Sequence, residues 1–337
     1  MVEGSTASRR YEKVQVIVII VAMEQEAQPF ILKHSLKENN PSPFEHGSPM
    51  IAYSGEISAA AGQMITVHLI WNGRCKIHNV NHVATTAAGV SAYASIAAFK
   101  PDLVISAGTA GGFSELGAKI GDVYLSTKCV FHGRRIPHSV QPSRDGCRST
   151  LEEYGFGHFR SPPLGHLAAA AGVKQGVVSS SDSLDCSAMD LQLLRSEGAV
   201  VKEMEAAAVA WVCQQLSVPF IALKSVTDIV DGDRRTEQEF YANLERASEA
   251  LQWRLSTVVG CLGGTRLGEW AGDRASGVDI SHNCGAEDSG GSSGGDVVSR
   301  KFVSDDGDIQ QWLFSAAVVG LSVGLGIGLS LVYLGRR

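Results

Sequence analysis

Continuous runs of apolar residues alternate along the chain with segments whose apolar positions repeat at the helical period. Such runs lie at residues 14–21 and 103–107, with less regular ones at 175–179 and 219–228. Runs rich in Val and Ile are typical of strands buried on both faces of a sheet. Residues 84–99, with many small side chains, are helical in period and are expected to pack on that sheet. The alternation predicts an α/β domain.

The apolar run that begins at Leu103 leads into a cluster of glycines, Gly108, Gly111 and Gly112, with Thr109 among them. Residues without a side chain let backbone N–H groups approach a ligand closely. We therefore interpret this segment as a strand that ends in a binding loop. A tight strand-to-loop connection without a ligand has the same pattern.

The C-terminal part of the chain has a different pattern. Residues 263–311 are rich in Gly, Ser and Asp and lack periodic apolar positions, which predicts a flexible acidic linker. The 23 residues at 312–334 carry no charge, and a helix of that length can cross a hydrocarbon core of about 30 Å. With a disordered segment at 1–13, the pattern predicts a folded domain at 14–262 and one C-terminal transmembrane helix, a tail anchor.

The predicted span bears on location. A span so close to the C-terminus can be inserted only after synthesis, so we expect the domain to face the cytosol. The short dibasic tail, Arg336 and Arg337, favours an organelle outer membrane. Gly320, Gly324 and Gly328 share one helix face and could let two spans pack together, although abundant glycine in a permissive segment gives the same stripe.

Composition excludes some classes of protein. The net charge of the 337 residues is -6, which offers no basic footprint for nucleic acid. The seven cysteines lack Cys-x-x-Cys or Cys/His ligand spacing and favour free thiols. We expect no disulfide framework, no metal site and no nucleic-acid partner.

Acidic side chains stand at the ends of several predicted elements. Glu24 and Glu26 follow the strand at 14–21, and Asp228 ends a later strand. Glu205 precedes an alanine-rich apolar helix, where burial costs several kcal/mol unless protein groups or sugar hydroxyls bond the carboxylate. Ligands of α/β sheets bind beyond the carboxyl ends of strands, which makes these acids candidate functional residues. Helix capping and turn formation are the structural alternatives.

Seven segments resemble, in the same order, the 5'-methylthioadenosine/S-adenosylhomocysteine nucleosidases, and most closely their plant-type branch. They are AMEQE at 22–26, AGTAGGF at 107–113, IGDV at 120–123, FHGRRIP at 131–137, DSLD at 182–185, EME at 203–205 and TD at 227–228. The resemblance covers about residues 14–260 and does not reach the linker or the predicted span. It implies a nucleoside phosphorylase-like fold of three layers, α/β/α, around a central mixed, twisted sheet, and a homodimer.

The resemblance also implies an activity: hydrolysis of the N-glycosidic bond of 5'-methylthioadenosine to adenine and methylthioribose, in methionine salvage. S-adenosylhomocysteine is a second candidate substrate, water is the nucleophile, and no cofactor is needed. Asp228, supported by Thr227, would protonate purine N7, which requires a raised pKa. Glu26 would hold and deprotonate the water, and Glu205 would accept hydrogen bonds from the ribose 2' and 3' hydroxyls.

Further residues are implied as substrate-binding: Met23, Val83, Thr109, Leu184, Asp185, Glu203 and Met204. The chain departs from the family's pattern at two positions. Ala84 stands where a glycine is usual, and Ser181 replaces the glycine that normally precedes Asp182. Added side-chain atoms restrict how closely a backbone approaches a ligand, so both changes bear on substrate affinity.

Two other functions stay open at this point. Nucleoside phosphorylases share the implied fold but use phosphate instead of water, and they need arginines positioned for the anion. The glycine cluster contains no arginine, and Arg134 and Arg135 are the nearby candidates. A non-catalytic storage or binding relative is the other alternative, although Glu26 and Asp228 are both present.

Overall fold

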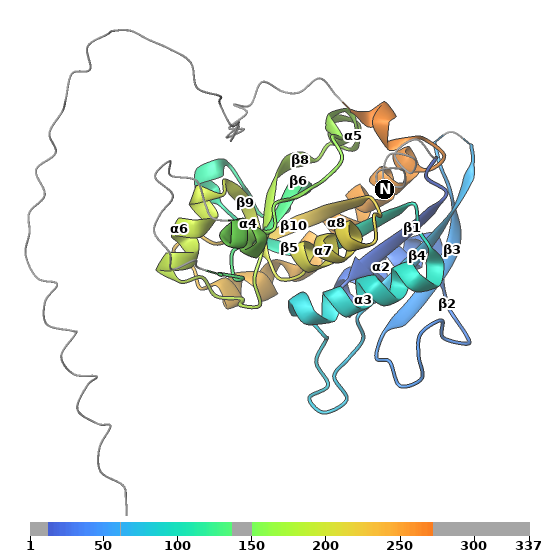
Figure 1. Cartoon of the computed structure of the whole chain (residues 1–337), viewed down its shortest axis with the longest axis horizontal. Helices are drawn as coiled ribbons and strands as arrows, with labels where there is room; N and C mark the ends of the chain where they lie inside the picture. The colour runs from blue at the N-terminus through green and yellow to red at the C-terminus, as the bar shows by residue number, and fades with distance from the viewer. Residues whose placement is uncertain (1–12, 61, 137–149, 272–337) are drawn as a thin grey trace, which may run out of the picture. The chain divides into compact units, whose positions relative to one another are not determined.

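The computed structural model describes residues 13–60, 62–136 and 150–271 (Figure 1). Residues 1–12, the predicted span at 312–334 and the predicted linker from residue 272 onward lie outside the described residues. Within the described ranges, no helix combines the length and the apolar character that a membrane crossing needs.

One mixed sheet of ten strands forms the centre of the domain. Its strands are β1 (Val16–Val21), β2 (Lys37–Glu38), β3 (Ile51–Ser58), β4 (Met64–Trp71), β5 (Leu103–Gly112), β6 (Val123–Phe131), β7 (Phe159–Arg160), β8 (Lys174–Ser180), β9 (Ala199–Glu203) and β10 (Phe220–Ile229). The sheet order is β10-β6-β8-β9-β5-β1-β4-β3-β2, with β7 paired to β6. The mixed sheet expected from the resemblance is therefore confirmed.

Parallel pairing determines where the strands end. β1 pairs in parallel with β4 and β5, and β5 pairs in parallel with β10. The carboxyl ends of β1, β5 and β10 consequently meet at one edge. Because β10 also pairs with β6, the strands β5, β9, β8, β6 and β10 close on one another. This part of the sheet is therefore closed, whereas β1, β4, β3 and β2 continue from β5 as an open sheet.

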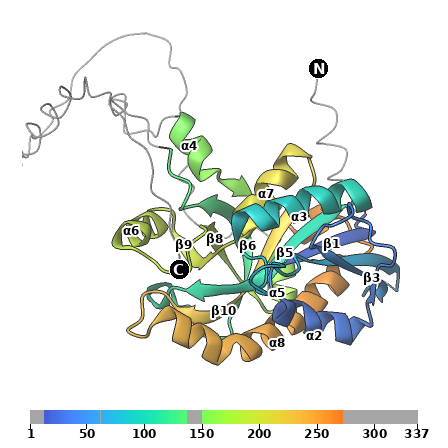
Figure 2. The same ribbon diagram turned by 90° about the horizontal axis from the view of Figure 1, so that it is seen from below.

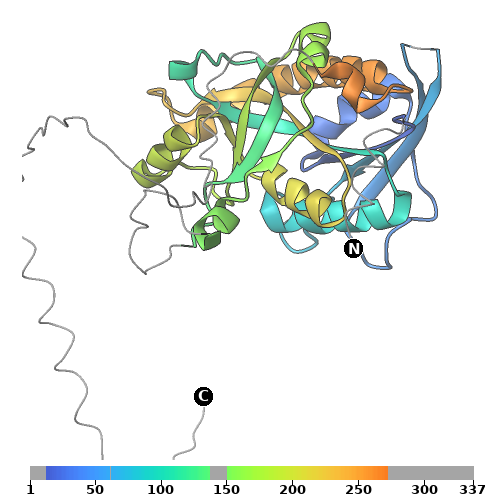
Figure 3. The same ribbon diagram turned by 45° about the horizontal axis from the view of Figure 1, so that its top comes forward.

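Helices cover both faces of the sheet. They are α2 (Glu24–His34), α3 (Ala84–Phe99), α4 (Thr150–Phe156), α5 (Gly165–Ala171), α6 (Ala188–Ser196), α7 (Ala206–Gln215) and α8 (Thr236–Leu262). Figure 2 shows α3 and α7 on one face and α2 and α8 on the other, which confirms the three layers. In Figure 3, α3 and α7 lie side by side, and Gly89 of α3 faces Ala208 of α7 at close range.

Two sequence-based boundaries are wrong. The glycines after Leu103 do not form a loop, because β5 continues through Gly112 and pairs there with β9 and β10. Residues 263–271, expected as linker, pack on the domain: Leu267 is buried in the core, and Trp270 Nε1 donates to the Thr265 hydroxyl at 2.8 Å. The sequence-based boundary was wrong because these apolar residues stand singly among glycines and polar residues and form no periodic pattern.

Candidate active site

The acids identified from the sequence converge where the parallel strands end. Glu26 lies in the first turn of α2, directly after β1, and Thr109 lies within β5. Asp228 is near the end of β10. Glu203 ends β9, and Glu205 lies directly before α7. Segments that are far apart in the chain thus place these side chains along one edge of the sheet.

The side chain of Glu26 is buried and held by three donors. Its Oε1 accepts hydrogen bonds from the Thr109 backbone N–H at 2.7 Å and from the Thr109 hydroxyl at 2.8 Å. Its Oε2 accepts one from the Met23 N–H at 3.0 Å. Burial raises the pKa of Glu26, although Lys224 and these hydrogen bonds act against the shift. A fixed carboxylate with a raised pKa is suited to accept a proton from water.

A buried lysine that the sequence analysis missed lies among the acids. Lys224 is 1 % exposed, and its Nζ lies 2.9 Å from Oε2 of Glu203. Burial opposes the charge on Lys224, but Glu203, Glu205 and Glu26 outweigh it and raise the lysine pKa. The charged ammonium balances the group of carboxylates. A lysine inside the apolar run of β10 was the sequence signal that pointed to this role.

Protein groups bond both carboxylate oxygens of Glu203, which we expected to bind substrate. Oε2 accepts hydrogen bonds from the N–H groups of Glu205 and Ala206, each at 2.9 Å, and also pairs with Lys224. Oε1 accepts a hydrogen bond from the Ser180 hydroxyl. Although burial acts to raise the pKa of Glu203, Lys224 and these donors hold it below its usual value. Because protein donors occupy both oxygens, Glu203 fixes the start of α7 and the position of the lysine.

Glu205 keeps one oxygen available. Its Oε1 accepts a hydrogen bond from the Ala84 backbone N–H at 2.9 Å. In the part of the chain that the structure describes, no donor bonds Oε2. Burial raises the pKa of Glu205 to about 7, against the opposing effect of Lys224. This oxygen can accept a hydrogen bond from a ligand hydroxyl.

Asp228 lies in a different environment. It is 2 % exposed, and its Oδ1 accepts a hydrogen bond from the Thr227 hydroxyl at 2.7 Å. A Cβ at Gly111 would lie 2.7 Å from Oδ2, so only glycine leaves room for this carboxyl beside β5. Burial raises the pKa of Asp228, whereas Thr227 and Lys202 lower it. A shielded carboxyl with a raised pKa is suited to donate a proton.

A second buried lysine, also missed from the sequence, supports the loop that follows β8. Lys202 Nζ donates to the backbone carbonyls of Ser183 at 2.7 Å and Leu184 at 2.9 Å. Burial lowers the pKa of Lys202. The side chains of Leu184 and Asp185, expected near the purine, are exposed on this loop. Their backbone is therefore the part of the loop that the protein holds in place.

The other residues expected to bind substrate are partly or largely exposed. Met23 and Met204 are partly buried and stand next to the acids in the chain. Val83 is 42 % exposed and directly precedes α3. These side chains are open to a bound molecule.

Comparisons with known proteins agree with the geometry. A family model described as "Phosphorylase superfamily" matches residues 16–259. The chain belongs to the phosphorylase superfamily. It is 36% identical over 253 residues to a 5'-methylthioadenosine nucleosidase of Arabidopsis thaliana, covering 75% of this chain and 89% of that protein.

A further relative and a solved structure narrow the group within the superfamily. A 5'-methylthioadenosine/S-adenosylhomocysteine nucleosidase of Arabidopsis thaliana is 37% identical over 267 residues, which cover 79% of this chain and 99% of that protein. The apo structure of the Arabidopsis thaliana 5'-methylthioadenosine nucleosidase matches with a TM-score of 0.70 at 36% identity, covering 77% of this chain and 100% of the other. The chain belongs with these nucleosidases.

The two departures from the nucleosidase pattern have different structural consequences. Ala84 adopts φ 78°, a left-handed conformation that favours glycine. Its N–H nevertheless reaches Glu205. Ser181 is accommodated by a glycine opposite: a Cβ at Gly133 would lie 2.5 Å from the Ser181 Cβ. The first change stores backbone strain beside the site, and the second is matched by a small neighbour.

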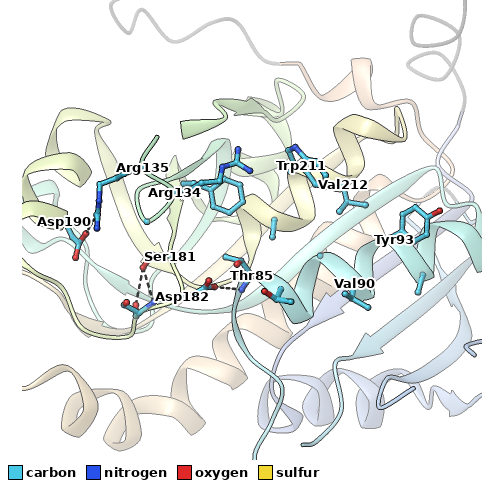
Figure 4. A pocket seen from close by; sticks show the side chains of 17 residues that line it. Thr85, Val90, Tyr93, Arg134, Arg135, Ser181, Asp182, Asp190, Trp211 and Val212 are labelled. Atoms are coloured by element: carbon cyan, nitrogen blue, oxygen red, sulfur yellow. Dashed lines mark hydrogen bonds and ion pairs between the residues drawn. The ribbon is translucent and has the colours of Figure 1, made fainter. Parts of the chain in front are cut away.

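The arginines that a superfamily phosphorylase would need are bound to protein groups. Arg134 donates to the carbonyls of Gly155 and Tyr154, each at 2.8 Å. Arg135 forms an ion pair of 2.8 Å with Asp190. Both arginines line a cavity of about 780 Å³ between α3, α7 and the end of β6, as Figure 4 shows. None of these bonds joins either arginine to the acids at the strand ends.

Proposed function

We propose that the protein is a hydrolase that cleaves the N-glycosidic bond of 5'-methylthioadenosine, releasing adenine and methylthioribose for methionine salvage. One observation carries the proposal: two buried carboxyl groups with raised pKa values and different hydrogen-bond partners flank the glycine segment of β5. Glu26 lies beside Gly108: a Cβ placed on that glycine would be 3.2 Å from Glu26 Oε1. Asp228 lies beside Gly111: a Cβ placed there would be 2.7 Å from Asp228 Oδ2. One group can accept a proton, and the other can donate one.

Asp228 acts on the leaving group. Cleavage of a glycosidic bond leaves negative charge on the purine, so protonation at N7 makes adenine a better leaving group. The Thr227 hydroxyl bonds Oδ1, which leaves Oδ2 to carry the proton to N7. Burial keeps the proton on the carboxyl at higher pH than in water. Thr227 thereby orients the acid.

Glu26 acts on water, and Glu205 acts on the sugar. Thr109 and Met23 fix both oxygens of Glu26, which positions water for attack on the anomeric carbon and accepts its proton. The unbonded oxygen of Glu205 accepts hydrogen bonds from the ribose hydroxyls. Lys224 keeps the carboxylate group charged without contacting the substrate. No metal or organic cofactor takes part in these steps.

The substrate class follows from the residues around the acids. Met23 and Met204 pack against the ribose, and Val83 contributes to the same apolar wall. The backbone of Leu184 and Asp185, held in part by Lys202, lines the purine. We propose 5'-methylthioadenosine as the preferred substrate and S-adenosylhomocysteine as the one to compare, because its larger sulfur substituent needs a wider pocket.

We also propose that the protein is a homodimer that pairs through α3 and α7. Large apolar side chains are exposed on this face: Val90 by 58 %, Tyr93 by 61 % and Trp211 by 37 %. They line the cavity of Figure 4. Apolar side chains gathered around one cavity are typical of a surface that is covered by a partner.

A membrane location remains a proposal from the sequence. The 23 uncharged residues at 312–334 form the proposed tail anchor, and the segment from residue 272 to 311 forms the tether. The hydrolase domain then faces the cytosol on an organelle outer membrane. Fluorescence microscopy of the tagged chain, with and without residues 312–337, tests this. Diffuse signal from the intact chain would refute it.

Adenine release tests the activity. The full chain, purified in detergent, is assayed with 5'-methylthioadenosine and separately with S-adenosylhomocysteine, in buffer with and without phosphate. We expect equal release from the first substrate under both conditions. Release that depends on phosphate would make the chain a phosphorylase. A folded protein silent in both buffers would be a storage or binding relative.

A further inference from the structure

The strand that carries Asp228 is irregular where the acid lies. Val226 pairs with Ala110 of β5, and Asp228 pairs with the next residue, Gly111. Thr227 is therefore an extra residue, a bulge, and the register of the strand shifts around it. A bulge re-aims side chains but weakens the ladder that would otherwise hold the strand. The ladder resumes at Asp228 and Ile229, and side chains of another element add hydrogen bonds to the backbone on either side of Asp228.

Helix α8 supplies those groups. Asn243 Nδ2 donates to the carbonyl of Thr227 at 3.0 Å, on one side of the acid. Oε2 of Glu239 accepts a hydrogen bond from the N–H of Ile229 at 2.8 Å, on the other side. Asn243 Nδ2 also donates to the backbone carbonyl of Glu239 at 2.8 Å, so the Asn243 side chain is anchored to the turn that carries Glu239. Both belong to the first turns of α8, which runs along β10 (Figure 2).

Glu239 is also a charge near the acid. It is 8 % exposed, and in the described residues it takes part in no ion pair. The charged groups that act on Asp228 are Lys202 from β9 and Glu239 from α8, with the Thr227 hydroxyl from its own strand. Lys202 favours the carboxylate and Glu239 favours the protonated carboxyl. Glu239 of α8 and Lys202 of β9 therefore shift the pKa of Asp228 in opposite directions.

We propose that Glu239 and Asn243 are positioning residues for the general acid: they clamp the backbone on both sides of Asp228, and Glu239 adds a carboxylate beside it. The inference rests on the proposed function, in which Asp228 protonates the purine. Neither residue contacts the substrate. Each acts through the Thr227–Ile229 segment.

The variant Glu239→Gln separates the charge from the clamp. Its amide oxygen can still accept the hydrogen bond from Ile229, so the fold and the position of Asp228 are retained, while the charge is lost. A general acid works only when protonated, and activity falls as pH rises through its pKa. We expect the alkaline limb of kcat to move to lower pH, with KM nearly unchanged.

Glu237→Gln is the matched control. Glu237 lies in the same turn of α8 but is exposed, and its partner is the exposed Arg235 at 3.5 Å. Removing this charge is expected to leave the pH profile of the wild type. Both variants are measured by adenine release from 5'-methylthioadenosine in the full chain, with thermal unfolding as the check of folding.

Asn243→Ala tests the clamp. Loss of the bond to Thr227 lets the acid shift, and we expect kcat to fall about 10-fold while KM stays within twofold. A residue with a purely structural role would lower the unfolding temperature and leave kcat and the pH profile of the folded enzyme unchanged. That result for Asn243→Ala would overturn the clamp.

The outcomes distinguish this inference from the proposed function. If Asp228→Asn releases adenine like the wild type, Asp228 is not the acid, and the proposed function and the inference both fail. If Asp228→Asn is inactive but the profile of Glu239→Gln coincides with that of Glu237→Gln, only the inference about Glu239 fails. A shifted limb in Glu239→Gln alone supports it.

Discussion

The two ends of the β5 glycine segment hold carboxyl groups in opposite ways. At one end, Glu26, Glu203 and Glu205 surround the buried ammonium of Lys224, which acts against the rise in their pKa values that burial causes. At the other end, Asp228 forms no ion pair among the described residues; desolvation raises its pKa, and the charges of Lys202 and Glu239 act on it in opposite directions. In the proposed function, the same functional group thus serves as base, as acceptor for the ribose hydroxyls or as acid according to its neighbours. We therefore expect the acids around Lys224 to depend on its charge, and Asp228 to depend on its burial from water.

Removal of the cation is expected to have the largest effect. Lys224→Met leaves Glu203 buried without its ion pair, which costs about 3–5 kcal/mol of folding free energy. We expect a large fall in the denaturant midpoint and loss of adenine release. Lys202→Met, which removes hydrogen bonds to two loop carbonyls and a charge near Asp228 but breaks no ion pair of the described residues, is expected to cost about 1–3 kcal/mol. Equal stability of Lys224→Met and wild type would contradict the charge-balance account.

Added methyl groups on β5 compare the two ends directly. In Gly111→Ala the new Cβ meets Asp228 Oδ2 at 2.7 Å and displaces the acid, so we expect kcat to fall about 100-fold. In Gly108→Ala the contact with Glu26 Oε1 is 3.2 Å, which a small shift relieves, so the loss is smaller. Steady-state kinetics measure both. A larger loss in Gly108→Ala would reverse the comparison.

The pH dependence at the charged end follows from Glu205. In the proposed function, its Oε2 accepts hydrogen bonds from the ribose hydroxyls, most strongly when the carboxyl is deprotonated, and burial raises the pKa of Glu205 to about 7. We expect kcat/KM to decline as pH falls below about 7, mainly through a rise in KM. Glu205→Gln should lose affinity at all pH values and lack this acidic limb. An unchanged limb in that variant would assign it to another group.

The smallest expected effect is on stability, when the strain at Ala84 is relieved. Ala84→Gly relieves a left-handed conformation at φ 78° and should stabilise the domain by about 1 kcal/mol. This corresponds to an unfolding temperature higher by about 2–4 °C. Ala87→Gly, inside α3, serves as the control and should destabilise by about 1 kcal/mol. Destabilisation by Ala84→Gly would show that the alanine is not strained.

Local patterns predicted much of the fold and part of the site. The helix at Ala84–Phe99 lies where its period indicated, and the strand ends bring the motif acids together. The extent of β5 was missed, because pairing with β9 and β10 keeps its glycines in a strand. Lys224 and Glu239 were also missed: a lysine inside an apolar strand is unusual, but the partners of both residues come from distant segments, and no local pattern identifies those partners.

The most direct test of the account asks whether the two ends do different work. The 4-nitrophenyl glycoside of 5-methylthioribose releases 4-nitrophenolate, a leaving group that needs no protonation, but its hydrolysis still needs water activation. We predict that Asp228→Asn loses about 10³-fold in kcat on 5'-methylthioadenosine and little on the nitrophenyl glycoside, whereas Glu26→Gln loses activity on both. Equal losses of Asp228→Asn on the two substrates would contradict the assignment of Asp228 as the acid that protonates the leaving group.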